Sequence, residues 1–208
     1  MYLSQVELDP RNRETLRALA VPRRLHGAVE AAFAGPRTRR LWRLDRRGNR
    51  LWLLVLSEET PDLAGVVAQF GPPDGVAETR DYAPLLARVA DGSVWRFRLA
   101  ANPVKNVKVA GGRGAVRNHV TVEQQEQWLA ERAPKHGFAL EPDGFRVVDS
   151  RWISFDKATD GSPVRIHAVT FEGLLRVTDA GRFREALTHG IGRGKAYGLG
   201  LLTLMRAP

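Results

Sequence analysis

The histidines are the residues of this sequence best suited to move protons near neutral pH, because an unperturbed imidazole titrates close to pH 6.5. There are five of them, none in an HxH or HExxH spacing, and there is no cysteine. Thiol catalysis, disulfides and the usual zinc or iron–sulfur sites are therefore not expected. An imidazole with arginine and lysine beside it can still transfer a proton and stabilise charge on a phosphate. We expect a chemistry that uses neither a metal nor another cofactor.

His26 is the best placed of the five. It lies in PRRLHGAVEAAF, residues 22–33, whose apolar residues recur at helical spacing, and it falls at the edge of the face that this helix would bury. Arg23, three residues earlier, shares its side and can contact a phosphate, whereas Glu30, four residues later, can orient the imidazole. A surface histidine without a catalytic role is the competing interpretation. The other histidines fall in or beside expected structural elements, where a structural role is more common: His119, His136, His167 and His189.

The chain is strongly basic. Its 208 residues include 32 lysines and arginines against 23 acidic residues, which gives a net charge of +9. Seven arginines stand in RTRRLWRLDRRGNR, residues 37–50, against the single acid Asp45. This balance favours a polyanionic partner that is bound through phosphate contacts. Only five of the basic residues are lysine, so the base composition of the genome is another source of the arginine excess. For residues 37–50, a solvated hairpin without a partner is the alternative.

RNA is a polyanion that fits this chemistry, because it carries its own nucleophile. Its 2′-hydroxyl attacks the neighbouring phosphate when a base takes the hydroxyl proton and the leaving 5′-oxygen receives one. In-line positioning and positive charge near the phosphate complete the requirements, and DNA cannot react by this route. No strand has the RNP1-like pattern of the RNA-recognition module, so simple single-strand binding by stacked bases is not supported.

The segment GIGRGKAYGLGLLTL, residues 190–204, places five glycines within eleven residues. Glycine-rich loops that hold nucleotide phosphates follow a strand and open a helix. Here a helical pattern, DAGRFREALTHGI, precedes the loop and a strand pattern follows it. A P-loop is also disfavoured, because Gly194 and Lys195 are followed by Ala196 instead of a hydroxyl side chain. An NTP-dependent enzyme is therefore a minor alternative, and a plain turn from helix to strand is the simpler one.

The element patterns predict an α+β protein of two tandem ferredoxin-like (RRM-like) domains. Each half gives the order strand, helix, two strands, helix and strand, more loosely in the second half. In the first half the strands are expected over residues 1–8, 37–44, 50–57, 76–82 and 93–103, and the helices over residues 22–33 and 60–70. The stretch VKNVKVAGGRGAVRNH, residues 104–119, is expected as a loop between an N-terminal domain, residues 1–110, and a C-terminal domain, residues 119–208.

The second domain is expected to carry a long basic hairpin. Its strands, FRVVDSRWISFDK and VRIHAVTFEGLLRVTD, meet at an Asp-Gly turn, with Lys157 close to the tip and Arg151 and Arg165 on the strands. A basic hairpin can lie along an RNA groove and contact phosphates, and a solvated turn is the alternative.

No apolar run approaches the eighteen residues of a membrane-spanning helix, and MYLSQVEL lacks the order of a signal peptide. We therefore expect a soluble, cytoplasmic protein without a membrane partner.

Five stretches together resemble one family. MYLSQVEL, RRLHGAVEAAF, FRLAANPVKNVK, VTFEGLLRVTD and GIGRGKAYGLGLLTL look like the CasE family, the CRISPR repeat-RNA endoribonucleases of the type I-E Cascade system. The resemblance implies two ferredoxin-like domains that bind the stem-loop of CRISPR repeat RNA and cut at the base of the stem without a metal. The implied products are a 2′,3′-cyclic phosphate, or its opened form, and a 5′-hydroxyl. The implied partners are the RNA stem-loop and the other Cascade subunits.

The resemblance also assigns roles to residues. His26 matches the family's catalytic histidine, and Lys157 falls in the hairpin-tip region where the family places basic residues against the RNA. Arg23, from its position beside His26, would stabilise charge together with Lys157. In the glycine segment, the missing side chains would let the RNA backbone approach. The residues expected to contact RNA, including the two hairpin arginines, are Asn102, Lys105, Lys108, Arg151, Arg165, Gly192, Arg193, Gly194 and Lys195.

Three positions depart from the family pattern. Arg23 stands where a tyrosine is common, Ala100 where an arginine often precedes the ANP stretch, and Arg193 where proline is common. The missing tyrosine supports an alternative from another class, a catalytically silent RNA-binding subunit that caps the guide RNA.

Overall fold

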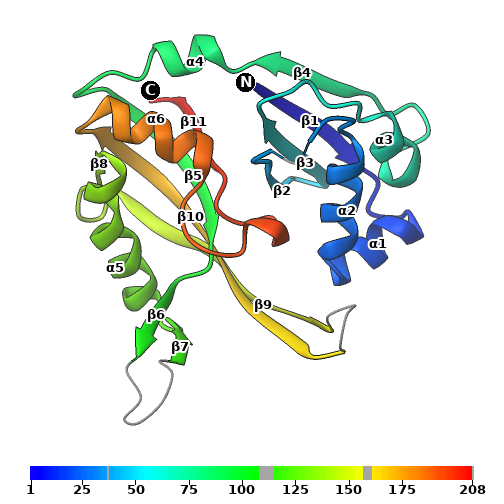
Figure 1. Ribbon diagram of the computed structural model, residues 1–208. Coiled ribbons are helices and arrows are strands. Elements are labelled where there is room, and N and C mark those ends of the chain that lie inside the picture. Colours follow the sequence, from blue (N-terminus) through cyan, green and yellow to red (C-terminus); the bar gives the residue numbers. More distant parts are fainter. Residues whose placement is uncertain (37, 108–114, 157–160, 208) are drawn as a thin grey trace.

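The computed structural model describes residues 1–36, 38–107, 115–156 and 161–207, and within these ranges its strands form two large antiparallel sheets and one short hairpin (Figure 1). The first sheet has the strand order β2-β3-β1-β4, which is that of a ferredoxin-like unit. Its elements are β1 (Tyr2–Leu8), α1 (Arg13–Ala20), α2 (Arg23–Ala31), β2 (Leu41–Arg47), β3 (Arg50–Ser57), α3 (Ala64–Phe70) and β4 (Ala77–Asp81).

Helices α1, α2 and α3 pack on one face of this sheet around a buried apolar cluster. Leu25 and Val29 of α2 lie in this cluster, 1% and 0% exposed, at the four-residue spacing that puts them on one side of the helix. The cluster thereby fixes which side of α2 faces outward, and the expected helix over residues 22–33 is confirmed.

The second sheet has the order β11-β5-β10-β8, and β9 pairs with β10. Its core contains Trp128 and Phe171, whose rings stack with centroids 6.2 Å apart. Its elements are β5 (Val94–Ala101), α5 (Val122–Arg132), the 3-10 helix η1 (Ala133–His136), β8 (Phe138–Ala139), β9 (Phe145–Asp156), β10 (Pro163–Val177), α6 (Ala180–His189), the 3-10 helix η2 (Lys195–Tyr197) and β11 (Leu202–Arg206). Helix α4 (Ala83–Ala87) precedes it in the chain.

Strand β5 corrects the expected domain boundary. We expected residues 93–103 in the N-terminal domain, but β5 pairs with β10 and β11 and is the first strand of the second ferredoxin-like unit. The reason is that its inward residues, Trp95, Phe97 and Leu99, belong to the core of the second sheet. The change of sheet therefore falls between β4 and β5, and not within residues 110–119.

Residues 104–119 are also not a plain loop. Val104–Val107 forms β6 and Ala115–Asn118 forms β7, and the two pair as a hairpin between β5 and α5. This hairpin is an excursion within the second unit.

Arg43 joins the two sheets from a buried position on β2. Its guanidinium donates to both carboxylate oxygens of Asp45 at 2.7 Å, and across the interface to the carbonyl oxygens of Arg98 and Leu201 and the hydroxyl of Thr203, each at 2.8 Å. All five of its N–H groups are therefore satisfied.

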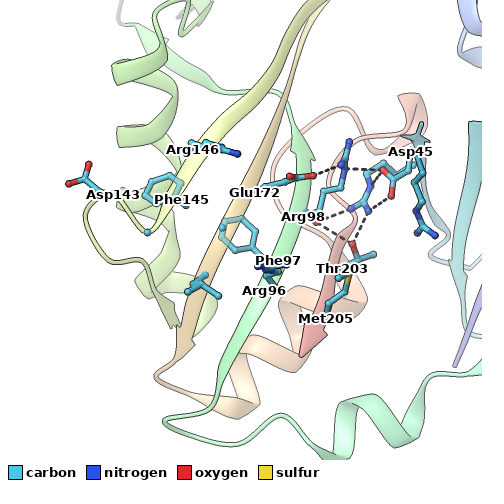
Figure 2. Close-up of a pocket in the computed structure, with 15 residues that line it drawn as sticks. Asp45, Arg96, Phe97, Arg98, Asp143, Phe145, Arg146, Glu172, Thr203 and Met205 are labelled. Atoms are coloured by element: carbon cyan, nitrogen blue, oxygen red, sulfur yellow. Dashed lines mark hydrogen bonds and ion pairs between the residues drawn. The ribbon is translucent and has the colours of Figure 1, made fainter. Parts of the chain in front are cut away.

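Arg43, Asp45, Arg98 and Thr203 also line a cavity of about 780 Å³ between β2 and the second sheet. Figure 2 shows the side chain of Arg98 between Asp45 and Glu172, with which it forms ion pairs. Burial alone would raise the pKa of Asp45, but hydrogen bonds and charge from Arg43, with the charges of Arg98 and Arg47, hold it below its usual value. This cavity is thus lined by a paired network that connects the two units.

Candidate nucleic-acid interface

His26 lies beside the buried stripe of α2, and 23% of its side chain is exposed. Its Nδ1 atom is 3.9 Å from Oε1 of Glu30, one turn along the helix. Oε2 of Glu30 accepts a 2.8 Å hydrogen bond from Nη1 of Arg40, whose guanidinium lies 4.0 Å from the ring centroid of Phe33. The carboxylate is thus held between the imidazole and a buried arginine.

Three segments that are distant in the sequence meet around this helix. Helix α2, which begins at the exposed Arg23, packs against η2 of the glycine segment, and α1 packs against β9 of the long hairpin. Figure 1 shows the orange-red segment before β11 between the second sheet and α2. The sequence placed candidate residues on all three segments, and the fold brings these segments together.

A cleft of about 640 Å³ lies between the hairpin and the first unit. Its lining includes Pro22 and Leu25 at the start of α2, Arg46 of β2 and Arg151 of β9. Nε of Arg151 is 3.8 Å from Oδ2 of Asp149, an exposed pair that leaves this arginine accessible. Two of the basic stretches singled out from the sequence therefore face one space near the His26 helix.

The glycine segment follows α6 and leads into β11, as the sequence indicated, so it has the opposite order from a nucleotide-binding loop. Its glycines have positive φ, +80° at Gly198 and +82° at Gly192, which L side chains rarely adopt. A Cβ on Gly198 would lie 2.6 Å from Cζ3 of Trp42, and one on Gly192 would lie 3.3 Å from Cη2 of Trp128. Close packing inside the protein thus requires these glycines, a reason that the sequence pattern did not reveal.

Cations gather where the glycine segment meets the end of α5. Burial, and then the charge of Arg39, lowers the pKa of Lys195, whose Nζ donates to the carbonyl of Gly192 at 3.1 Å. Burial also lowers the pKa of His136, and the charges of Lys195, Arg132 and Lys135 lower it further. Cations this close repel one another, which favours a polyanion beside them.

The same group of cations extends toward the β6–β7 hairpin. The Arg132 guanidinium lies 4.3 Å from the ring centroid of Trp128 and donates to the carbonyl of Val104 at 3.5 Å. Burial lowers the pKa of His119, and the charges of Lys105 and Arg132 add to the effect. We call the set Arg39, Lys195, His136, Arg132, His119 and Lys105 the basic band.

The remaining predicted residues are more scattered. Asn102 is half-buried directly after β5, Arg193 is exposed in the glycine segment, and Arg165 is exposed on β10. Lys108 and Lys157 lie outside the described residues. The sequence analysis missed Arg39, Arg132 and His136 as band members, because only the tertiary fold brings the end of α5 to the glycine segment; their basic character was the one signal available. Across the described ranges, no three His, Asp or Glu side chains are grouped to hold a metal ion, and no helix is long and apolar enough to cross a bilayer.

Two ferredoxin-like units with a histidine-bearing helix and a basic band define a class of protein suited to hold a polyanion. The family model described as CRISPR associated protein matches residues 1–206. The CRISPR-associated endoribonuclease Cse3 of Thermus thermophilus is 32% identical over 219 residues, covering 98% of this chain and 99% of that protein. The chain therefore belongs to the CRISPR associated protein family, as a member of the CasE type that includes Cse3.

Solved structures agree with this assignment. A CRISPR endoribonuclease Cse3 bound to a 19-nucleotide RNA is similar with a TM-score of 0.83 and 29% identity over 100% of both chains. A chain of a CRISPR RNA-guided surveillance complex in a pre-nicking state is similar with a TM-score of 0.71 and 28% identity, again over 100% of both chains. The expected pair of ferredoxin-like domains is confirmed.

Proposed function

We propose that this protein is an endoribonuclease that binds the stem-loop of CRISPR repeat RNA, cuts the precursor transcript at the base of the stem and remains bound as a Cascade subunit. Membership of the family supports this function, as do the endoribonuclease activity for which its Thermus relative is named and the RNA-bound and complex-bound structural neighbours. The function places the protein in the cytoplasm, where the transcript is made.

One observation carries the assignment within this chain. His26 lies on the helix that packs against the glycine segment, and the basic band continues from that segment along the end of α5. A proton-transfer group is thereby placed beside a path of cations suited to an RNA backbone.

The proposed reaction needs only the RNA and protein side chains. The 2′-oxygen bonds to phosphorus, the bond from phosphorus to O5′ breaks, one proton leaves the 2′-hydroxyl and one reaches O5′. The products are a 2′,3′-cyclic phosphate and a 5′-hydroxyl, and no electrons are exchanged with a cofactor. His26 makes one of the two proton transfers, and Arg23 with Lys157 stabilises the charge on the phosphate.

The test is cleavage of a hairpin repeat RNA in EDTA by the wild-type protein and by His26→Ala. A second RNA carries a single 2′-deoxy nucleotide before the cut. We expect the wild type to cut the all-ribose RNA, and both the variant and the deoxy RNA to give binding without cleavage.

Each other result has a distinct meaning. Tight binding by the wild type with no cut would identify the alternative, a silent subunit that caps the guide RNA, for which the arginine at position 23 is the observation in favour. Normal cutting by His26→Ala would reject the role of His26 while leaving the substrate in place. Cleavage that stops in EDTA would reject the metal-free reaction.

A further inference from the structure

Trp152 is a large aromatic side chain on β9 that remains 45% exposed. Its indole lies flat on the imidazole of His167, its cross-strand neighbour on β10, with ring centroids 4.4 Å apart and an interplanar angle of 6°. One face of the indole is therefore covered by a parallel ring. The exposed part of a flat aromatic surface held in this way is available for stacking.

The orientation of the indole is fixed from behind. His167 is 4% exposed, and both of its ring nitrogens have partners. Nδ1 is 3.1 Å from the carbonyl oxygen of His119, which can only accept, so Nδ1 carries the proton. Nε2 is 2.9 Å from the hydroxyl of Ser150, which in turn accepts a 3.4 Å contact from Nε2 of Gln125 on α5. Little side-chain entropy remains to be lost when a ligand stacks on Trp152.

The surroundings of Trp152 are cationic. Cζ of Arg165 is 5.0 Å from the indole centroid, and Arg151 is its neighbour in the chain; both arginines are exposed. Residues of this part of β9 border the same cleft as Pro22 and Leu25, at the start of the helix that carries His26. An exposed aromatic ring beside the guanidinium of Arg165 matches a nucleotide, whose base stacks while its phosphate pairs with arginine.

We propose that Trp152 is a stacking site for the base of one unpaired nucleotide next to the RNA stem. The proposal rests on the function proposed above and adds a residue that holds the RNA in register for cleavage. No RNP1-like strand is needed, because a single indole braced by His167 serves one base.

Binding of hairpin RNAs to the full-length protein tests this role. The RNA set contains hairpins in each of which one unpaired nucleotide is abasic. Each RNA is titrated against the wild type, Trp152→Ala and Trp152→Phe. The control variant is Val148→Ala, which removes an exposed apolar side chain from the same strand. We expect Trp152→Ala to weaken binding of the intact RNA roughly 5- to 100-fold, the range of a lost base stack, and Trp152→Phe to weaken it less. One abasic position should weaken wild-type binding by a similar factor and leave Trp152→Ala binding unchanged.

Two results would overturn the stacking role. The first is that Trp152→Ala binds as tightly as the wild type. The second is that it loses affinity but responds to every abasic position as the wild type does, which would identify a contact to the backbone. In both cases wild-type binding to the hairpin keeps the proposed function intact, whereas no wild-type binding to any hairpin would reject both proposals together.

Discussion

Nδ1 of His26 lies 3.9 Å from Oε1 of Glu30, and the other carboxylate oxygen of Glu30 is held by Arg40. The carboxylate therefore cannot turn away from the imidazole without losing a hydrogen bond to a buried cation. An acid–base group is more effective when a neighbour fixes its orientation and its pKa. We therefore propose that Glu30 positions His26 for proton transfer.

Replacing Glu30 with glutamine tests this relationship. The amide keeps an oxygen for Arg40 but removes the negative charge near His26. We expect cleavage at pH 7 to fall by roughly ten-fold and the pH–rate profile to change, since a well-placed acid–base group contributes about 100- to 10,000-fold. Single-turnover rates at saturating protein, measured across the pH range, give both quantities.

A matched control is Glu14→Gln, because Glu14 pairs with Arg17 and Arg24 between α1 and α2 at some distance from the imidazole. It should leave the profile in place. An unchanged profile in Glu30→Gln would show that the carboxylate has only a structural role.

RNA binding should strengthen as the pH falls. The pKa values of His119 and His136 lie below 6.5 in the free protein, because both are partly buried beside cations, so both are neutral at pH 7. A phosphate nearby favours the charged imidazole and raises its pKa, so RNA binding takes up protons as the pH falls toward the pKa of the bound imidazoles. Dissociation constants at constant ionic strength between pH 5.5 and 8 measure this slope.

His136→Asn should flatten that slope, and His189→Asn, which changes an exposed histidine at the end of α6, should keep it. If the affinity of the wild type for RNA does not vary with pH, the histidines of the basic band do not lie beside the bound RNA.

The sequence predicted what depends on local spacing. Residues three and four apart share a helix face wherever the helix packs, so the position of His26 beside the buried stripe followed from its neighbours. The partner strands of β5 could not be predicted in this way. Its apolar and polar residues alternate in the same way whichever sheet it joins, so only the tertiary pairing determines its sheet. The stack of Trp152 on His167 depends on tertiary pairing too.

The glycine segment can be tested for its structural role by comparing two glycines. Gly198 and Gly48 both have positive φ, +80° and +59°, but a Cβ on Gly48 meets nothing within 4 Å, whereas one on Gly198 meets the ring of Trp42. Gly48→Ala should cost about 1 kcal/mol of unfolding free energy from its backbone conformation alone. Gly198→Ala should cost about 2 kcal/mol more, because it adds a clash in a packed core. Urea denaturation measures the unfolding free energy of both variants. Equal losses in the two variants would show that the glycine segment accommodates the added Cβ without strain.

The buried pair of Arg43 and Asp45 should make stability depend on acid pH in a defined direction. The pKa of Asp45 is below 3.8 in the folded protein, so its contribution is fully present above the unfolded pKa of about 3.9 and is lost as the pH falls through the folded value. Asp45→Asn leaves the buried guanidinium of Arg43 without its counter-charge and should lower the unfolding free energy by about 3 kcal/mol at pH 7. The gap between variant and wild type should narrow below about pH 4, where the carboxyl of the unfolded chain begins to take up a proton while that of the folded protein stays charged. Denaturant titrations at pH 7, 5 and 3 measure the difference in unfolding free energy between wild type and variant. The control is Asp74→Asn, which changes an exposed carboxylate and should match the wild type at each pH. A difference that stays constant down to pH 3 would mean that the charge of Asp45 does not hold the two sheets together.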